Sequence, residues 1–314
     1  MKPTPKIYLS VVIPVYNEQD NLKNLTARVM KVCDGLHHAY EIIFINDGSR
    51  DNSYEMLNIL QEKHAKHIRV VHFNGNFGQH MAVMAGFEYS RGEIVVTLDA
   101  DLQNPPEEIP KLLAEIEKGH DSVGGIRIDR QDSYFRKWAS KLNNKIRYFL
   151  TGIKMTDQGC MLRAYNRKVV DLMVSSYERA AFIPALAYTL SANPTEVEVD
   201  HSDREAGTSK YNLYKLLRLN FDLMTGFSLL PLQIFTLVGM LISMCSFLFV
   251  IYMFMRRIIV GPEADGLFTL FAILYFLIGI VLMGLGIMGE YIGRIHQNSR
   301  SRPKFIIQDI REAK

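Results

Sequence analysis

The chain has 314 residues, with 36 lysines and arginines against 33 aspartates and glutamates, for a formal net charge of +3. So small a charge, spread along the chain, argues against a nucleic-acid partner. Cys33, Cys160 and Cys245 are far apart and lack metal-ligand spacing, which favours a reducing compartment without disulfide bonds.

Apolar runs and amphipathic stretches alternate through the first hundred residues. The apolar runs predict strands at residues 9–13, 40–45, 68–73 and from 95 onward, and the stretches between them predict helices that begin near residues 20, 51 and 78. Strands that alternate with helices indicate an α/β domain with a mostly parallel, right-handed sheet, covered by helices on both faces.

Every predicted strand is followed by polar residues: Glu18, Asp47, Asn74 or Asn76, and Asp99. In a parallel sheet the carboxyl ends of the strands lie along one edge, where ligands bind. One polar strand end is an ordinary turn signal. Four of them on the same edge predict a pocket.

The acidic pair of this edge is Asp99 and Asp101, followed by Gln103. If the backbone stays extended, alternation places the three side chains on one side of the chain. Three oxygen donors that face one way suit a hard divalent cation that also holds a phosphate. The alternative is a solvated strand end, since short acidic pairs are common in loops.

After about residue 210 the composition becomes strongly apolar. Residues 229–255 and 267–289 carry no charge, and each run is long enough to cross a hydrocarbon core of roughly 30 Å as a helix. Buried helices of a soluble protein are the alternative. Lysine and arginine are richer outside the two runs than in the connector 256–266, so the positive-inside rule places both ends in the cytoplasm.

We therefore expect four parts. They are a cytoplasmic catalytic domain over 1–209, an interfacial amphipathic helix over 210–228, a transmembrane helical hairpin over 229–290 and a cytoplasmic tail over 291–314. The helix is inferred from apolar residues at helical spacing with cations between them. A core helix of the soluble domain is the alternative reading of that segment.

Three short motifs carry a resemblance to a known family: VIPVYNE at 12–18, NDGS at 46–49 and DAD at 99–101. They resemble the nucleotide-sugar-binding domain of family 2 glycosyltransferases, which implies the GT-A fold. The membrane hairpin makes the chain more similar to the polyprenyl-phosphate branch of that family.

Within the branch, the motifs NFGQH at 76–80, LDADLQNPPEEIP at 98–110 and GCMLRAY at 159–165 resemble transferases of 4-deoxy-4-formamido-L-arabinose. The resemblance implies inverting transfer of that sugar from UDP to undecaprenyl phosphate at the bacterial inner membrane, for lipid A modification and polymyxin resistance. It also implies a lipid bilayer as partner and a homotetrameric assembly. The alternative is an undecaprenyl-phosphate glucosyl- or mannosyltransferase for O-antigen or cell-envelope glycans.

The resemblance assigns the donor side of the site. Pro14, Tyr16, Glu18 and Asp47 are implied to frame the uridine. The family more often has two acids where this chain has Asn46 and Asp47, so Asp47 becomes the expected base-reading carboxylate.

The diphosphate is assigned to later residues. Asp99 is implied to contact the nucleotide, and Asp101 with Gln103 to hold Mg²⁺ or Mn²⁺ on the diphosphate, where the metal offsets developing charge. Arg204 and Lys210 lie in a segment that is implied to close over the diphosphate. A plain polar linker is the alternative for that segment.

The acceptor side is assigned to Arg127, Arg136 and Ser140, which are implied to hold the lipid phosphate. Arg136 and Ser140 are four residues apart on a predicted helix, so both can reach one anion. A basic helix on the membrane surface is the alternative. Asp157 is implied to be a catalytic acid that orients the acceptor or the sugar, with a turn role as its alternative.

Two other classes of protein share parts of this pattern. A processive polysaccharide synthase has the same nucleotide-binding half, but its Gln-x-x-Arg-Trp motif is absent, because the single tryptophan, Trp138, lies in RKWAS. A non-catalytic membrane scaffold would not be expected to keep Asp99, Asp101 and both arginines. The sequence therefore predicts a glycosyltransferase.

Overall fold

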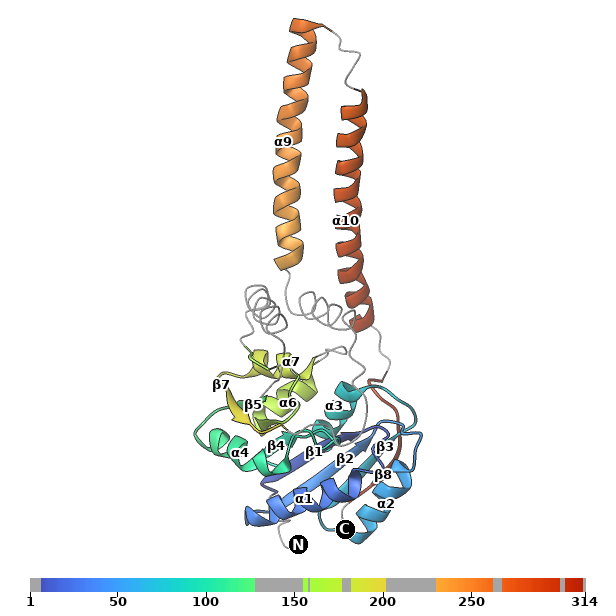
Figure 1. Ribbon diagram of the computed structural model, residues 1–314, viewed down its shortest axis with the longest axis vertical. Helices are drawn as coiled ribbons and strands as arrows, with labels where there is room; N and C mark the ends of the chain where they lie inside the picture. The colour runs from blue at the N-terminus through green and yellow to red at the C-terminus, as the bar shows by residue number, and fades with distance from the viewer. Residues whose placement is uncertain are drawn as a thin grey trace. The chain divides into compact units, whose positions relative to one another are not determined.

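The computed structural model describes residues 7–127, 155–157, 159–176, 182–201, 230–261, 267–299 and 303–312. The chain divides into two compact units. Within the described ranges, the first unit holds the strands and the helices that precede residue 201, and the second holds the two long helices α9 and α10 (Figure 1). The predicted interfacial helix at 210–228 lies outside the described residues.

An eight-stranded sheet forms the centre of the first unit, with strands β1 (Leu9–Val15), β2 (Tyr40–Asn46), β3 (Ile68–Phe73), β4 (Ile94–Thr97), β5 (Ser122–Arg127), β6 (Arg163–Asn166), β7 (Pro194–Val199) and β8 (Ile307–Arg311). Their order across the sheet is β7-β5-β6-β4-β1-β2-β3-β8. Strands β1 to β4 pair in parallel, whereas β6 and β8 are antiparallel to their neighbours. The prediction of a mostly parallel sheet is confirmed.

Helices cover both faces of this sheet (Figure 1). The helices of the first unit are α1 (Leu22–Gly35), α2 (Ser53–Lys63), α3 (Gln79–Tyr89), α4 (Ile109–Glu117), α6 (Arg167–Ser175) and α7 (Ile183–Leu190), with a 3-10 turn at Pro106–Glu108. Apolar residues of α1, α2 and α4 form one buried cluster with the sheet. The α3 helix packs on the other face, so closely that a side chain at Gly86 would overlap Val12.

The strands and helices predicted for the first hundred residues begin within two residues of the observed ones. The reason is that each strand is a short apolar run buried on both faces, as β2 and β3 are along their whole length. The polar strand ends are thereby fixed along one edge of the sheet.

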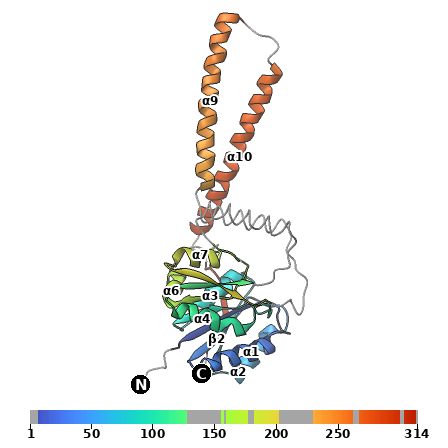
Figure 2. The same cartoon turned by 60° about the vertical axis from the view of Figure 1, so that its left-hand side comes forward.

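The second unit contains α9 (Leu230–Val260) and α10 (Leu267–Ser299). Both are long and apolar enough to cross a membrane, over Leu232–Arg256 and Ile273–Gly293. The two helices run side by side (Figure 2) and approach at Gly284, where a side chain would overlap the Phe235 ring. Most of their described large apolar side chains are exposed and are not covered by the rest of the protein. Such exposure is typical of helices that face lipid.

The segment predicted as a C-terminal tail has more structure than its sequence indicated. The α10 helix continues to Ser299, beyond residue 290, where the predicted hairpin ends. The chain then contributes β8 to the sheet of the first unit, antiparallel to β3. The sheet of the first unit is therefore completed by residues that follow the second apolar helix.

Candidate active site

The carboxyl ends of β1, β2 and β4 and the start of α3 form one edge of the sheet. Parallel register places Val15 beside Asn46 and Val12 beside Thr97. Hydrogen bonds then connect the loops that follow: the Asn17 N–H donates to Ser49 Oγ at 3.1 Å. The predicted pocket edge is thus one continuous group of polar residues.

The loop after β1 presents an aromatic ring to solvent. Tyr16 is 41% exposed, and the next residue, Asn17, adopts a left-handed backbone conformation with φ of 58°. Asn17 Oδ1 accepts the Arg50 N–H at 2.7 Å, and Glu18 accepts from Asn21 at 2.7 Å. Side chains of the protein hold this turn, while the Tyr16 ring stays available for stacking.

Asp47 connects the loop after β2 to the segment before α3. Its two carboxylate oxygens accept the backbone N–H groups of Phe77 and Gly78 at 2.6 and 2.9 Å. The side chain is 3% exposed. Burial raises the pKa of Asp47, and the two N–H bonds oppose the rise. The carboxylate is therefore first of all a structural tie, and base reading by Asp47 stays a prediction.

A close approach of two loops explains the glycine after Asp47. Gly48 has φ of +65°, and a side chain there would overlap the Gly75 carbonyl. Only glycine combines this left-handed conformation with so near a neighbour. The loop after β2 and the segment 74–79 are thereby packed against each other.

Asn46 takes part in a buried chain of hydrogen bonds through His72. Asn46 Nδ2 lies 3.0 Å from His72 Nδ1, and His72 Nε2 lies 3.2 Å from Asn58 Oδ1. Burial lowers the pKa of His72 to about 4, so the ring is neutral, with Nε2 donating to Asn58 and Nδ1 accepting from Asn46. An amide at position 46 supplies the donor that an ionised acid would lack.

The loop after β4 carries the predicted phosphate-binding residues. Asp99, Asp101 and Gln103 are partly exposed and alternate with the buried Ala100 and Leu102. The prediction assumed an extended backbone, which is wrong here, because the strand ends at Thr97 and Leu102 has φ of 61°. The chain makes a tight turn here and is not extended, and the Asp101 carboxylate accepts the Gln103 N–H at 3.2 Å.

Two side-chain amides hold Asp99. Gln79 Nε2, at the start of α3, donates to Asp99 Oδ1 at 2.6 Å, and Asn104 Nδ2 lies 3.4 Å from Asp99 Oδ2. Asn104 is itself buried and accepts from Cys160 Sγ at 3.7 Å. Burial raises the pKa of the Cys160 thiol to about 11, so this thiol is a neutral packing group.

Arg127 and Asp157 form a bidentate ion pair at the end of β5. Arg127 Nε and one Nη donate to the two Asp157 oxygens at 2.6 and 2.8 Å, and both side chains are largely buried. The Gly159 N–H donates to the same carboxylate at 3.0 Å, which is the turn role considered for Asp157. A side chain at position 159 would lie 2.7 Å from an Arg127 Nη, so the guanidinium fills the space that glycine leaves.

The ion pair belongs to the same site as the acidic loop. The hydrogen bonds that Arg127 donates to Asp157 raise the pKa of Arg127 although burial opposes the rise, and the charges of Asp157 and Asp99 add to it. The Asn104–Cys160 contact joins the loop after β4 to the turn that carries Asp157. Arg127 thus lies near enough to Asp99 for their charges to interact.

The donor set of the acidic loop fits a divalent cation that a substrate helps to hold. Within the described ranges, no three His, Cys, Asp or Glu side chains gather closely enough to bind a metal by themselves. Mg²⁺ is commonly held by one or two carboxylates plus substrate phosphates. Asp101 and Gln103 offer two hard oxygen donors for such a cation.

The structure leaves part of the predicted site undescribed. Arg136, Ser140, Arg204 and Lys210 lie outside the described residues. Pro14, Tyr16, Glu18, Asp47, Asp99, Asp101, Gln103, Arg127 and Asp157 are described, and all follow or lie near the carboxyl ends of strands.

Comparison with known proteins adds a family to this geometry. Residues 10–173 match the model of the family described as "Glycosyl transferase family 2". The chain belongs to glycosyl transferase family 2.

Its curated relatives in this family match the chain almost from end to end. An undecaprenyl-phosphate 4-deoxy-4-formamido-L-arabinose transferase of Serratia proteamaculans (strain 568) is 47% identical over 99% of this chain and 95% of the relative. The enzyme of the same name from Proteus mirabilis (strain HI4320) is 48% identical over 96% and 93%. The predicted family resemblance is confirmed.

Solved structures match this family 2 chain at a greater distance. Mannosyl-3-phosphoglycerate synthase from Rubrobacter xylanophilus aligns with a TM-score of 0.49 and 15% identity, over 68% of this chain and 71% of that one. Glucosyl-3-phosphoglycerate synthase from Mycobacterium tuberculosis, in complex with Mn²⁺, uridine diphosphate and phosphoglyceric acid, aligns with a TM-score of 0.48 and 18% identity, over 70% and 76%.

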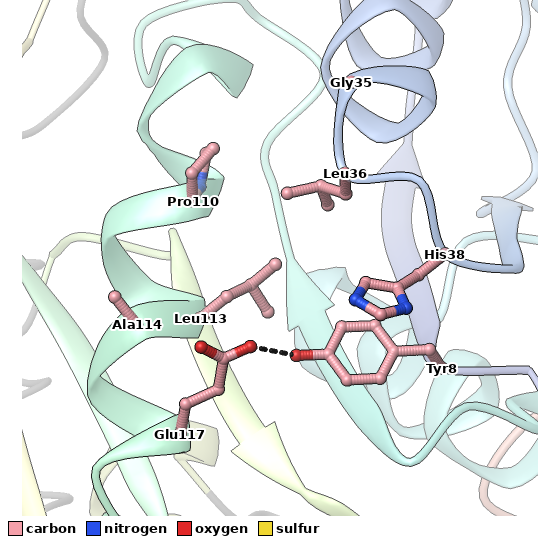
Figure 3. Close-up of a pocket in the computed structure, with 8 residues that line it drawn as sticks. All are labelled: Tyr8, Gly35, Leu36, His38, Pro110, Leu113, Ala114 and Glu117. Atoms are coloured by element: carbon pink, nitrogen blue, oxygen red, sulfur yellow. Dashed lines mark hydrogen bonds between the residues drawn. The ribbon is translucent and has the colours of Figure 1, made fainter.

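A hollow of about 280 Å³ lies at the opposite edge of the sheet (Figure 3). It adjoins Tyr8, just before β1, and the turn before β2, and it contains the bond from Tyr8 to Glu117 at 2.7 Å. Burial, followed by the bond to Glu117, raises the pKa of Tyr8 to about 12. Because the carboxyl ends of the strands point away from it, the hollow is not part of the family 2 site.

Sequence reasoning missed two residues of the site. Gln79 and Asn104 hold Asp99 from both sides, yet neither was assigned a role. Both lie inside motifs that the sequence singled out, at 76–80 and 98–110. An amide two to five residues from a candidate carboxylate, or at the start of the next helix, is the signal that could have identified them.

Proposed function

We propose that this chain is a membrane-bound inverting glycosyltransferase that moves 4-deoxy-4-formamido-L-arabinose from UDP to undecaprenyl phosphate, for lipid A modification. The observation that carries the proposal is 47% identity over 99% of the chain to a relative of that name. The polar edge at the carboxyl ends of the strands supports it, because that edge is where α/β folds bind nucleotides.

The donor is expected to lie along β1, β2 and β4. The exposed Tyr16 ring offers a stacking surface to uracil, next to Glu18 and the loop fixed by Asp47. Asp99 would contact the nucleotide, and Asp101 with Gln103 would hold Mg²⁺ or Mn²⁺. A bound divalent cation would offset the charge that develops on the UDP leaving group.

The acceptor needs a cation more than it needs a base. A phosphate monoester oxygen is already anionic at neutral pH, so the site has to bring two negatively charged groups together in a defined geometry. Arg127 supplies one cation beside Asp99. Both oxygens of Asp157 accept hydrogen bonds from Arg127. We therefore assign Asp157 the role of orienting the guanidinium and not that of a general base.

A transfer assay tests the proposal. Membranes that contain the chain are supplied with undecaprenyl phosphate and, one at a time, with UDP-linked 4-deoxy-4-formamido-L-arabinose, glucose or mannose. We expect a lipid-linked product and UDP from the first donor. If only UDP-glucose or UDP-mannose gives product, the proposed sugar is wrong and the chain transfers that hexose. If no donor gives product, the transferase assignment is contradicted.

The Arg127–Asp157 pair is tested by two variants. Asp157→Asn keeps the shape of the pair but removes its charge, and should raise the apparent KM for undecaprenyl phosphate while UDP binding is unchanged. Arg127→Lys keeps a positive charge but loses the planar fork, and should do the same. Loss of UDP binding in both variants would move the pair to the donor side.

We further propose that α9 and α10 span the bacterial inner membrane, with the catalytic domain in the cytoplasm. The richer flanking cations support this orientation. In a background that lacks Cys245, an impermeant thiol reagent should label Ala264→Cys from outside the cell and should not label Lys314→Cys. The opposite pattern would overturn the orientation. We also propose that the chain assembles as a homotetramer, which a measurement of its mass in detergent tests.

A further inference from the structure

The segment that follows α10 contacts the loop that carries the donor site. Phe305 stacks on Phe73, with ring centroids 5.0 Å apart and planes 11° from parallel. The Asn74 N–H donates to the Ile306 carbonyl at 3.1 Å. Residues 305–306 therefore meet the chain where β3 ends and the segment 74–79 begins.

The segment 74–79 connects this contact to the candidate site. Phe77 packs edge-on against Phe73 at 5.6 Å, so Phe305, Phe73 and Phe77 form one aromatic cluster. The backbone of Phe77 and its neighbour Gly78 binds the Asp47 carboxylate. The next residue, Gln79, donates to Asp99. Phe305 is therefore connected through Phe73 and the segment 74–79 to the loops that carry Asp47 and Asp99.

The segment is secured on either side of this contact. Lys304 Nζ donates to the Ser176 carbonyl at 2.9 Å. Beyond β8, Glu312 binds Arg69 at 2.9 Å and Arg91 at 2.8 Å. Phe305 is thus held at a fixed place along the edge of the sheet, as a support for a neighbouring loop has to be.

We propose that Phe305 is a positioning residue for the nucleotide-sugar site. Its ring fixes Phe73 and Phe77, and through them the segment 74–79, in the conformation that binds Asp47 and Asp99. The inference rests on the proposed function, because it concerns the UDP-sugar side of that site. It makes the chain that follows the second apolar helix part of the donor site.

The chain offers a matched control in the same apolar cluster. Ile310 packs against the cluster of Ile43, Ile45, Val71 and Phe73, as Phe305 does. In register, however, Ile310 lies opposite Val71, inside β3 and away from the segment 74–79. Truncating Ile310 removes packing from the same strand edge without touching the loop.

The experiment uses the full chain in detergent, with UDP and Mn²⁺ as the binding probe. Phe305→Ala should weaken UDP binding about tenfold and raise the KM for the UDP-sugar, while the KM for undecaprenyl phosphate stays unchanged. Phe305→Tyr keeps the stacked ring and should restore binding. Ile310→Ala should lower the melting temperature and leave UDP binding at the wild-type value.

Two results would overturn the inference: wild-type UDP binding in Phe305→Ala, or equal weakening in Ile310→Ala. If Phe305→Ala does not fold, Phe305→Leu replaces it, because leucine keeps most of the side-chain volume but cannot stack. Its UDP binding is then compared with that of Ile310→Ala in the same way. Failure of the wild-type chain to bind UDP at all would overturn the proposed function, and this inference with it. The two failures are therefore distinguishable.

Discussion

The loops after β2 and β4 both carry acidic residues close to the strand end, but these residues have different surroundings. Asp47 is buried, and backbone N–H groups occupy both of its oxygens. Asp99 and Asp101 are partly exposed, and the bonds to Asp99 come from the side chains of Gln79 and Asn104. One acid ties two loops together, whereas the other two are partly open to solvent. An acidic strand end is thus not by itself a catalytic group.

The largest effect should come from the exposed acid that would hold the metal. Asp101→Asn removes charge with little change in volume, and should lower kcat/KM roughly thousandfold, or by about 4 kcal/mol. The melting temperature should stay close to that of the wild type, because the change is at a partly exposed side chain. Full activity in this variant, or in wild-type protein with excess chelator, would contradict the metal assignment.

The buried acid should behave in the opposite way. Asp47→Ala leaves the N–H groups of Phe77 and Gly78 without their acceptor, and should lower the free energy of unfolding by about 3 kcal/mol. Chemical denaturation in detergent measures this loss. Asp101→Asn is the control, and equal stability of the two variants would remove the distinction between the loops.

The buried histidine behind Asn46 predicts a pH dependence of stability. The pKa of His72 is about 4 in the folded chain and about 6.5 when unfolded. Below pH 6.5 the unfolded chain therefore binds more protons, and stability falls as the pH falls. Between pH 7.5 and 5 we expect a loss of about 2 kcal/mol.

The control is His72→Gln, which cannot titrate. Its stability should fall less over the same pH range, by the share that His72 contributes. Asp309, Arg311 and Glu55 also act on His72, and they are unchanged in this variant. Identical pH profiles for the variant and the wild type would show that another group titrates.

The smallest effect should come from the amide that holds Asp99. Gln79→Ala removes one hydrogen bond to a charged oxygen at a partly exposed site, worth about 1 kcal/mol or a factor of roughly five in the KM for the UDP-sugar. Gln79→Glu places a like charge beside Asp99 and should raise the KM for the UDP-sugar further. An unchanged KM in both variants would separate Gln79 from the site.

Much of this arrangement could be predicted from the sequence, for a local reason. Strands such as β2 and β3 are apolar runs with polar residues after them, so their position and the edge at which Asp47 and Asp99 meet follow from short-range patterns. The short motifs at the strand ends added the resemblance to family 2 glycosyltransferases.

The rest depends on contacts between distant residues. Arg127 and Asp157 were expected to act separately, but they form one ion pair across 30 positions. Asp47 was expected to read a base, and nothing in Asn-Asp-Gly-Ser indicates that two N–H groups from residues 77 and 78 already bind it. Local patterns locate a carboxylate, but its partners are set by tertiary structure.

Strand β8 was missed for the same reason. Its sequence, Ile-Gln-Asp-Ile-Arg, is short, and three of its five residues are charged or polar, so periodicity alone gives a weak strand signal. What makes it a strand is pairing with β3, and the register of that pairing cannot be read from either segment. Edge strands are often short and charged, which is what makes them hard to predict.

The position of β8 also sets an order of events during protein synthesis. Arg69 and its partner Glu312 are 243 residues apart, so at about 5–20 residues per second the ribosome needs roughly 12–50 s to pass from one to the other. Until then the outer edge of β3 has no strand beside it, and such an edge can pair with another chain. Both apolar helices are translated within this interval. The sheet of each newly made chain is therefore completed only after both apolar helices have been translated.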